Sequence, residues 1–201
     1  MDAVRRQFLQ ALERDPTDLL ASVWVLNRIP YPFDGNIVTY ATWRHDLARD
    51  LQVDPSAVLI TGSAAFGISL NPNKNYKAFD ADSDIDVAVV SDYHFTEGWR
   101  TLRNLGPRLH GLPPRSKQAV NDHVYRLIYW GTIATDRILG LLPYGPQWQN
   151  AIARAAQRIP TLDRTIKIRV YRDLDSLRAY QVNNLNSLKT TYLSREAQNN
   201  V

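Results

Sequence analysis

Two aspartates separated by one residue, Asp84 and Asp86, are the side chains in this sequence best suited to chemistry. They belong to the segment 84–90, whose Ile and Val residues predict a buried strand. Because side chains alternate between the faces of a strand, both carboxylates are expected on one face and Ile85 and Val87 on the other. Two neighbouring carboxylates repel each other and need a cation. The pattern therefore predicts a divalent-metal site in which Asp84 and Asp86 are the metal ligands.

A Gly-Ser turn precedes the two acids in the sequence. Gly62 and Ser63 follow an apolar run that predicts a strand over residues 57–61. Glycine accepts a positive φ and lets backbone N–H groups point outward, and a serine hydroxyl can donate to a phosphate oxygen. A helix that begins near Ala64 would add its N-terminal dipole. The turn therefore predicts a phosphate-binding element next to the metal site, with Gly62 and Ser63 as nucleotide-binding residues.

Together these two elements resemble the signature of the nucleotidyltransferase superfamily of the DNA polymerase β type. That signature is an apolar strand, Gly with Gly or Ser, a spacer, and two acids that alternate with apolar residues. Here Thr61-Gly62-Ser63 and Asp84-Ile85-Asp86-Val87 carry the resemblance, and Gly67 stands where many members have a second glycine. The match lies within residues 59–90, so it concerns the core of the fold.

The resemblance implies an α/β (α+β) fold with a small mixed sheet, helices on one face and the other face open as a nucleotide cleft. It implies transfer of a nucleoside monophosphate from a nucleoside triphosphate to an acceptor hydroxyl, with release of pyrophosphate. Mg²⁺ or Mn²⁺ is the implied cofactor, and the implied acceptors are an RNA 3′ end, a protein or a small molecule. The short chain is also similar to small bacterial transferases of toxin–antitoxin and antiviral defence loci.

The spacer between the motifs, residues 64–83, is longer than is usual in that superfamily. Its excess is the polar stretch 71–77, and such an insertion costs little loop entropy. Two interpretations of this stretch remain open. Lys74, Tyr76 and Lys77 contact the nucleotide or the acceptor, or the stretch is a solvated surface loop.

A third acid, which active members of the superfamily carry on a later strand, is missing from its expected place. The candidate strand 166–171 places its apolar residues on one face. The face toward Asp84 and Asp86 then carries Lys167 and Arg169, so cations stand where an acid is expected.

Three explanations for this departure remain open. Asp163 or Asp173 bends in from a strand end, although Asp173 is more simply an N-cap. Alternatively the enzyme needs no protein base, Arg169 stabilises the developing charge as a catalytic residue, and Lys167 binds nucleotide. In the third explanation an ion pair between Asp86 and Arg169 neutralises the site. The favoured prediction is an active nucleotidyltransferase, and the alternative is an inactive nucleotide-binding regulatory or partner module.

Composition narrows the classes of function. The chain has no cysteine, which excludes disulfides, thiolate metal sites and cysteine nucleophiles. The four histidines lack metal-ligand spacing, so packing or surface roles are expected for them. The net charge is +4, which suits RNA or another polyanion without requiring one. Cations gather in two clusters that could bind RNA or triphosphate, or form a solvated face: Arg100, Arg103, Arg108, Arg115 and Lys117, and then Arg164, Lys167, Arg169 and Arg172.

The chain length fits a single domain over residues 1–201. We predict an N-terminal helical cap at 1–55, a nucleotidyltransferase core at 56–188 and a polar tail at 189–201. No apolar run approaches the ~20 residues of a membrane span, so a cytoplasmic protein is expected. Apolar spacing predicts helices over residues 2–14, 37–50, 96–105, 121–142, 147–157 and 174–188.

Overall fold

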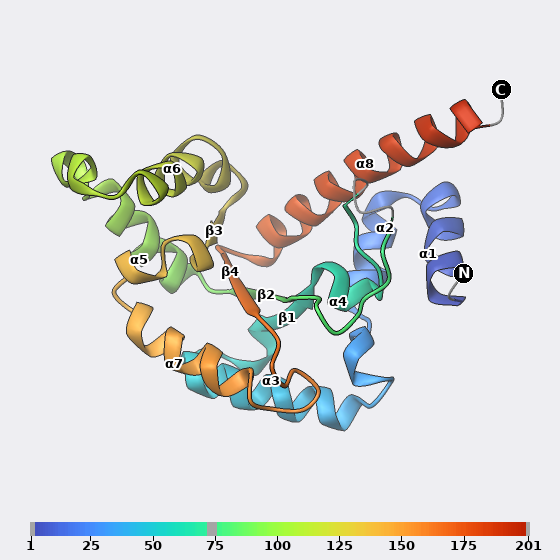
Figure 1. Cartoon of the computed structure of the whole chain (residues 1–201), viewed down its shortest axis with the longest axis horizontal. Helices are drawn as coiled ribbons and strands as arrows, with labels where there is room; N and C mark the ends of the chain where they lie inside the picture. The colour runs from blue at the N-terminus through green and yellow to red at the C-terminus, as the bar shows by residue number, and fades with distance from the viewer. Residues whose placement is uncertain (1–2, 72–75, 200–201) are drawn as a thin grey trace.

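The computed structural model describes residues 3–71 and 76–199. A four-stranded mixed sheet with the strand order β1-β2-β4-β3 lies at its centre, between helices (Figure 1). The central pair β2 and β4 is parallel, and both outer strands run antiparallel to their neighbours. The α+β class and the small mixed sheet expected from the sequence are confirmed. The strands are β1 (Val58–Thr61), β2 (Ile85–Val90), β3 (Thr132–Ala134) and β4 (Ile166–Tyr171).

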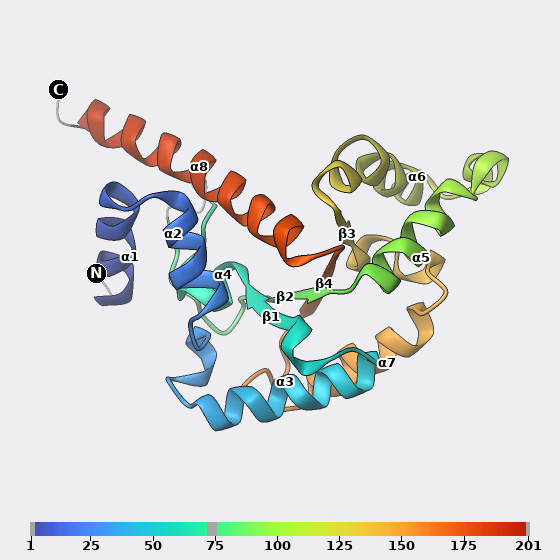
Figure 2. The same ribbon diagram turned by 180° about the vertical axis from the view of Figure 1, so that it is seen from behind.

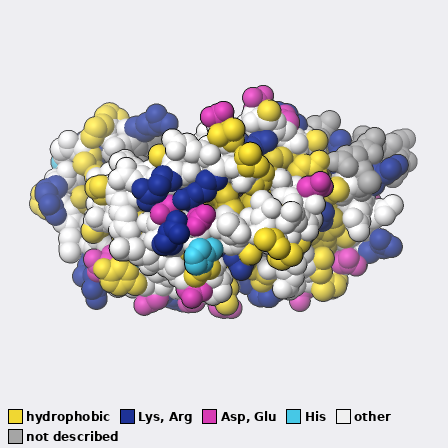
Figure 3. All heavy atoms as spheres, turned by 90° about the horizontal axis from the view of Figure 1, so that it is seen from below, with side chains coloured by type: hydrophobic (Ala, Val, Ile, Leu, Met, Phe, Trp, Pro, Cys, Tyr) yellow, Lys and Arg dark blue, Asp and Glu magenta, His cyan; other side chains and the backbone are white. Residues whose placement is uncertain are grey.

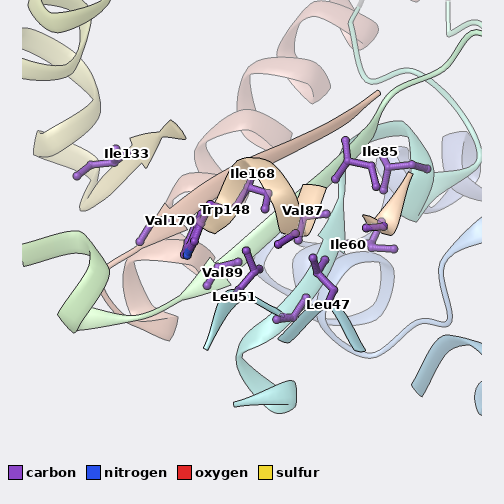
Figure 4. Close-up of a cluster of buried hydrophobic side chains, with 14 of the residues drawn as sticks. Leu47, Leu51, Ile60, Ile85, Val87, Val89, Ile133, Trp148, Ile168 and Val170 are labelled. Atoms are coloured by element: carbon purple, nitrogen blue, oxygen red, sulfur yellow. The ribbon is translucent and has the colours of Figure 1, made fainter. Parts of the chain in front are cut away.

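One face of the sheet forms the main hydrophobic core. The residues that alternate with Asp86 in β2 and with Lys167 in β4 are buried on this face (Figure 4). Helices α3 (Ile37–Leu51) and α7 (Gly145–Ala155) pack against it through Leu47, Leu51 and Trp148. Burial of this apolar surface, at roughly 25 cal/mol per Å², fixes which face of β2 and β4 is left for polar side chains.

The outer surface of α3 and α7 carries charges of both signs. Figure 3 looks onto this side of the molecule and shows Lys and Arg side chains grouped around acidic ones. Asp50 of α3 forms ion pairs with Arg154 (3.0 Å) and Arg158 (2.8 Å). The pKa of Asp50 is lowered: burial alone would raise it, but the hydrogen bonds from the two arginines outweigh that effect. Two of the cations on this surface therefore share one acidic partner.

The second face of the sheet is covered in part by the long helix α8 (Leu174–Asn199) (Figures 1 and 2). Leu59, Ala88 and Tyr171 on this face are buried against Leu177 of the helix. Helices therefore lie on both faces, and the expectation of helices on one face only is wrong. Asp173 immediately precedes this helix, and its carboxylate accepts from Ser176 N at 2.6 Å as the predicted N-cap.

Helices α1 (Ala3–Arg14) and α2 (Thr17–Ala21) pack on α8 and α4 (Gly62–Phe66) in a second apolar cluster. Phe8, Trp24 and Phe66 form its centre, with Phe8 and Phe66 ring centroids 5.1 Å apart. Because α3 belongs to the main core, residues 1–55 contribute to two clusters rather than forming one layer. The same cluster extends α8: Leu185 and Leu188 are buried in it, and the helix continues through residues 189–199, which were expected to be a polar tail.

The segment 121–142 is not the long helix that its apolar spacing predicts. Helix α6 (Pro114–Asp122) leads into the π-helix η6 (His123–Leu127) and the 3-10 helix η7 (Ile128–Trp130). Gly131, at φ +61°, then reverses the chain into β3. The apolar residues of this segment are buried from several directions, so their spacing imitates one amphipathic helix. The 3-10 helices η8 (Thr135–Arg137) and η9 (Leu139–Leu141) follow β3.

The long spacer begins and ends as a paired ribbon. Ile68 and Ala78 form an antiparallel bridge, and Ser69 N donates to Lys77 O at 2.7 Å. Tyr76 is buried in the second apolar cluster, which removes it from the residues expected to contact nucleotide. Lys74 lies outside the described residues.

The remaining elements complete the chain. Within the described residues, no helix combines the length and the apolar character that crossing a bilayer requires. The elements not yet introduced are η1 (Ser22–Leu26), η2 (Tyr31–Phe33), η3 (Pro55–Ala57), α5 (Asp92–Arg103) and η5 (Gly106–Gly111).

Candidate functional site

The turn from β1 into α4 packs directly on Asp86. Gly62 has φ +61°, in the left-handed region that favours glycine. A Cβ placed on Gly62 would lie 3.2 Å from Asp86 Cγ and still closer to Oδ2. Glycine is thus required twice here, for the backbone angle and for the close approach of the carboxylate. Helix α4 has only five residues, so the turn itself, rather than the dipole of a long helix, carries the argument for phosphate binding.

Ser63 lies beside this carboxylate with its hydroxyl uncommitted. Its Oγ forms no hydrogen bond with any other described residue, and the residue lines a cavity of about 280 Å³. Asp84 and Asp86 line the same cavity, as does Lys77 from the spacer. The predicted nucleotide-binding and metal-binding residues of the two motifs are therefore brought together in one cavity.

Asp86 is the more enclosed of the two acids. It lies in β2 between Thr61 of β1 and Lys167 of β4, the residues opposite it in the sheet register. Burial raises the pKa of its carboxyl, and the charge of Lys167 opposes that rise. Within the described residues no group donates a hydrogen bond to this carboxylate. The charged form of the Asp86 carboxyl is therefore disfavoured by burial, and no described group donates a hydrogen bond that would stabilise it.

Asp84 lies immediately before β2 and is paired with Lys167. The ammonium of Lys167 forms an ion pair with Asp84 Oδ2, and both side chains are about two-fifths exposed. That hydrogen bond raises the pKa of Lys167, and the charges of Asp84 and Asp86 add to the effect while burial opposes it. The residue predicted to bind nucleotide thus lies on the face of the acids and supplies the counter-charge of one of them.

Arg169 lies on the same face of β4 as Lys167, as the alternation predicts. Its Nη1 donates to the hydroxyl of Tyr180 at 3.0 Å, and its guanidinium lies 4.9 Å from the centre of that ring. Among the described residues it forms no ion pair with Asp86. Neutralisation of Asp86 by an Arg169 ion pair, one of the three explanations drawn from the sequence, is therefore not present; a lysine–Asp84 pair takes its place.

Neither acid proposed to bend into the site does so. Asp173 caps α8 and pairs with Arg172, and its hydrogen bonds with Ser176 lower its pKa to about 2. Asp163 is exposed in a turn with φ +59° and does not line the cavities that contain Asp86. Both residues are excluded as the missing third acid.

A third acid shares a cavity with Asp86, and it comes from a segment where the sequence predicts helix. Asp136 in η8 lines a cavity of about 420 Å³ together with Asp86, Lys167 and Arg169. Its negative charge helps to raise the pKa of both Asp86 and Lys167. Gly131 followed by Thr-Ile-Ala-Thr was the sequence signal for a turn and a short strand that would have located it.

Asp136 is held in place by the residues around it. Thr135 Oγ1 donates to Ile168 O of β4 at 2.8 Å, and Arg137 pairs with Asp122 at 2.6 Å. The buried His123 donates from Nδ1 to Ala119 O (2.6 Å) and accepts from Ala134 N at Nε2 (3.0 Å). Burial lowers the pKa of His123 and favours this neutral form. The histidine packs, as expected, and it fixes the end of β3.

Arg164 donates three hydrogen bonds into the loop that precedes Asp84. Nη1 of Arg164, just before β4, donates to the carbonyl oxygens of Asp80 (2.6 Å), Ala81 (3.2 Å) and Ser83 (3.0 Å). Its guanidinium also lies 4.6 Å from the ring centre of Phe79. Ile85 N also donates to Thr165 O at 2.9 Å, which joins the start of β2 to the residue before β4. The position of Asp84 therefore depends on contacts made from the start of β4.

The donor set fits a hard divalent cation. No group of three His, Cys, Asp or Glu side chains in residues 3–71 and 76–199 is close enough to form a complete metal site. Asp84 and Asp86 nevertheless line one cavity, and no residue that the structure describes donates a hydrogen bond to the Asp86 carboxylate. Oxygen ligands of this kind suit Mg²⁺, which keeps several waters and needs only one or two protein carboxylates when substrate phosphates complete its shell.

Comparison with protein-family models, with curated proteins and with solved structures gave no match for this chain.

Proposed function

We propose that this protein is a metal-dependent nucleotidyltransferase of the DNA polymerase β type. The observation that carries the proposal is the Gly62 turn seated on the Asp86 carboxylate, with Ser63 and Asp84 in the same cavity. A backbone turn with a free hydroxyl beside two acids is the arrangement needed to hold a triphosphate and its counter-ion together.

Each residue has a task in this proposal. Asp84 and Asp86 would hold Mg²⁺ or Mn²⁺, which neutralises phosphate charge when bound. The backbone after Gly62 and the Ser63 hydroxyl hold the phosphate oxygens. Arg169 stabilises the charge that develops at the α-phosphate.

The transfer itself moves one phosphorus centre. The acceptor hydroxyl oxygen forms a bond to the α-phosphorus while the bond from that phosphorus to the bridging oxygen breaks, and pyrophosphate leaves. Asp136, on the wall of the cavity that contains Asp86 and Arg169, accepts the proton of the acceptor hydroxyl.

A second candidate function is a nucleotide-binding module without catalysis. The ion pair between Lys167 and Asp84 favours it, because a lysine already supplies charge where a metal ion would be needed. In this case the site binds nucleotide as a regulatory or partner-binding element and releases no pyrophosphate.

Pyrophosphate release separates the two candidates. The full chain is incubated with each nucleoside triphosphate, Mg²⁺ or Mn²⁺, and RNA, protein or small-molecule acceptors. Asp86→Asn is compared with Asp163→Asn, a variant of an exposed aspartate away from the site. Release by wild type and Asp163→Asn, but not by Asp86→Asn, supports the transferase. Nucleotide binding by the wild type with no release under any condition overturns catalysis and leaves the binding module.

A further inference from the structure

The part of α8 that borders the larger cavity presents mainly uncharged polar side chains. Opposite it, β2 and β4 present charged residues to the same cavity of about 420 Å³. The pattern of polar and apolar residues in α8 forms no simple stripe, so it did not predict that this helix borders a site. The α8 residues that line the cavity are Tyr180, Gln181, Asn184, Ser187, Leu188 and Thr191.

This cavity adjoins the one that contains Ser63. The two share Gly62, Leu70 and Asp86 in their walls, so they meet at the buried carboxylate. The smaller cavity, of about 280 Å³, contains the turn and both acids, which suits the phosphates and the cation. The larger one has the volume of a small-ligand site and is the space left for the nucleoside of the same molecule.

We propose that Gln181 and Asn184 form a nucleobase subsite that recognises adenine; this inference rests on the proposed function and names its substrate. A carboxamide presents a donor beside an acceptor, and the two together pair with the N6 and N7 edge of adenine. The base of a nucleotide would lie against the uncharged residues of α8. Its phosphate end would lie toward the charged residues of β2 and β4.

The contacts around the two amides support this assignment. Gln181 is buried, and its Nε2 donates to the Tyr171 hydroxyl at 3.4 Å, which orients the amide. Next to it, the Tyr180 ring, held against the Arg169 guanidinium, gives the cavity a flat wall, and aromatic rings stack on bases. Asn184 is exposed at the rim, with its amide unpaired among the described residues.

Competition binding tests the proposal with a matched pair of variants. Asn183 and Asn184 are adjacent and both exposed, but only Asn184 lines the cavity. The affinities of ATP, GTP, CTP, UTP and inorganic tripolyphosphate are measured with Mg²⁺ on wild type, Asn183→Ala and Asn184→Ala.

We expect the wild type to prefer ATP, and Asn184→Ala to weaken ATP by about 5- to 30-fold, the scale of a base contact. Asn183→Ala should leave ATP affinity unchanged, and neither variant should alter tripolyphosphate affinity. A wild type without preference for ATP, or an equal loss for all ligands in Asn184→Ala, overturns the adenine subsite while the transferase proposal stands. Failure of the wild type to bind any triphosphate, tripolyphosphate included, overturns the proposed function as well.

Gln181→Met provides a second test of the buried amide. The substitution keeps the length of the side chain and removes its hydrogen-bonding groups. Provided circular dichroism matches the wild type, a selective loss of ATP affinity is expected. A folded variant with wild-type ATP preference overturns the role of Gln181.

Discussion

The ammonium of Lys167 and the carboxylate of Asp84 form an ion pair although 83 positions separate the two residues in the sequence. The lysine lies on the strand where the resemblance drawn from the sequence implies a third acid, directly opposite Asp86 in the sheet register. Among the described residues, Asp84 therefore has an ion-pair partner and Asp86 has none. A cation that binds both acids has to compete with Lys167 for Asp84.

Removal of Lys167 should change metal affinity and phosphate affinity in opposite directions. Lys167→Met leaves the two acids without their nearest cation, so Mg²⁺ affinity in the absence of nucleotide should rise severalfold. Affinity for the triphosphate should fall, because a positive charge beside it is lost. Isothermal titration calorimetry measures the affinity for Mg²⁺ and the affinity for the triphosphate. Arg169→Met is the control, since that guanidinium is engaged by Tyr180 and its loss should change Mg²⁺ affinity less. Weaker Mg²⁺ binding by Lys167→Met would contradict the competition.

Gly62→Ala should be far more damaging than the same change at another left-handed glycine. Gly35 has φ +73° with nothing within 4 Å of a Cβ, whereas a Cβ on Gly62 meets Asp86. Gly35→Ala should therefore cost only the backbone strain, about 1–2 kcal/mol. Gly62→Ala adds displacement of the carboxylate and should abolish binding of Mg²⁺ and triphosphate. Thermal unfolding and nucleotide titration of both variants test this prediction. Equal losses of stability and binding in the two variants would show that the close contact between Gly62 and Asp86 is unimportant.

Asp86→Asn should stabilise the fold at neutral pH. Burial raises the folded-state pKa of Asp86, so the folded state holds a proton more tightly than the unfolded state does. Stability is therefore lost as the pH rises from the unfolded pKa through the folded one. The variant lacks this loss, so its Tm should exceed that of the wild type above that window. The gain should shrink toward pH 4. Calorimetry of both proteins from pH 4 to 8 measures this. A Tm difference that is the same at every pH, or a lower Tm for the variant, would refute the prediction.

Asp136→Asn should slow nucleotidyl transfer while triphosphate binding is largely kept. A proton acceptor contributes about 100-fold or more to such a step, whereas Asp136 need not contact the phosphates. Single-turnover rates and binding titrations separate the two effects. Asp163→Asn, an exposed acid in a turn, is the control and should transfer at the wild-type rate. If Asp136→Asn keeps full activity, the base lies elsewhere or is not needed.

Much of the sheet could be predicted from sequence because its signals are local. The alternation in β2 and β4 fixed which residues are buried and placed Asp86, Lys167 and Arg169 on one face. The Gly-Ser turn and the N-cap at Asp173 are also set by a few adjacent residues, and the described structure contains both.

The elements that could not be predicted depend on contacts distant in sequence. β3 has three residues and exists because β4 pairs with it, so its segment resembled a helix and concealed Asp136. The position of α8 over the second face follows from burial of Leu177 and Leu185 in two different clusters. The intrinsic strand or helix propensity of a segment carries no information about which distant segment it will pair with or pack on.

Arg164 has a consequence for biosynthesis. The carbonyl oxygens that it binds precede it by as many as 84 positions, so Asp80 to Asp84 leave the ribosome long before the guanidinium that secures them. Domains fold as units as they emerge. A nascent chain that ends before residue 164 therefore contains both sequence motifs but lacks the arginine contacts to the loop before Asp84, and the proposed nucleotide binding is expected only once translation has passed β4.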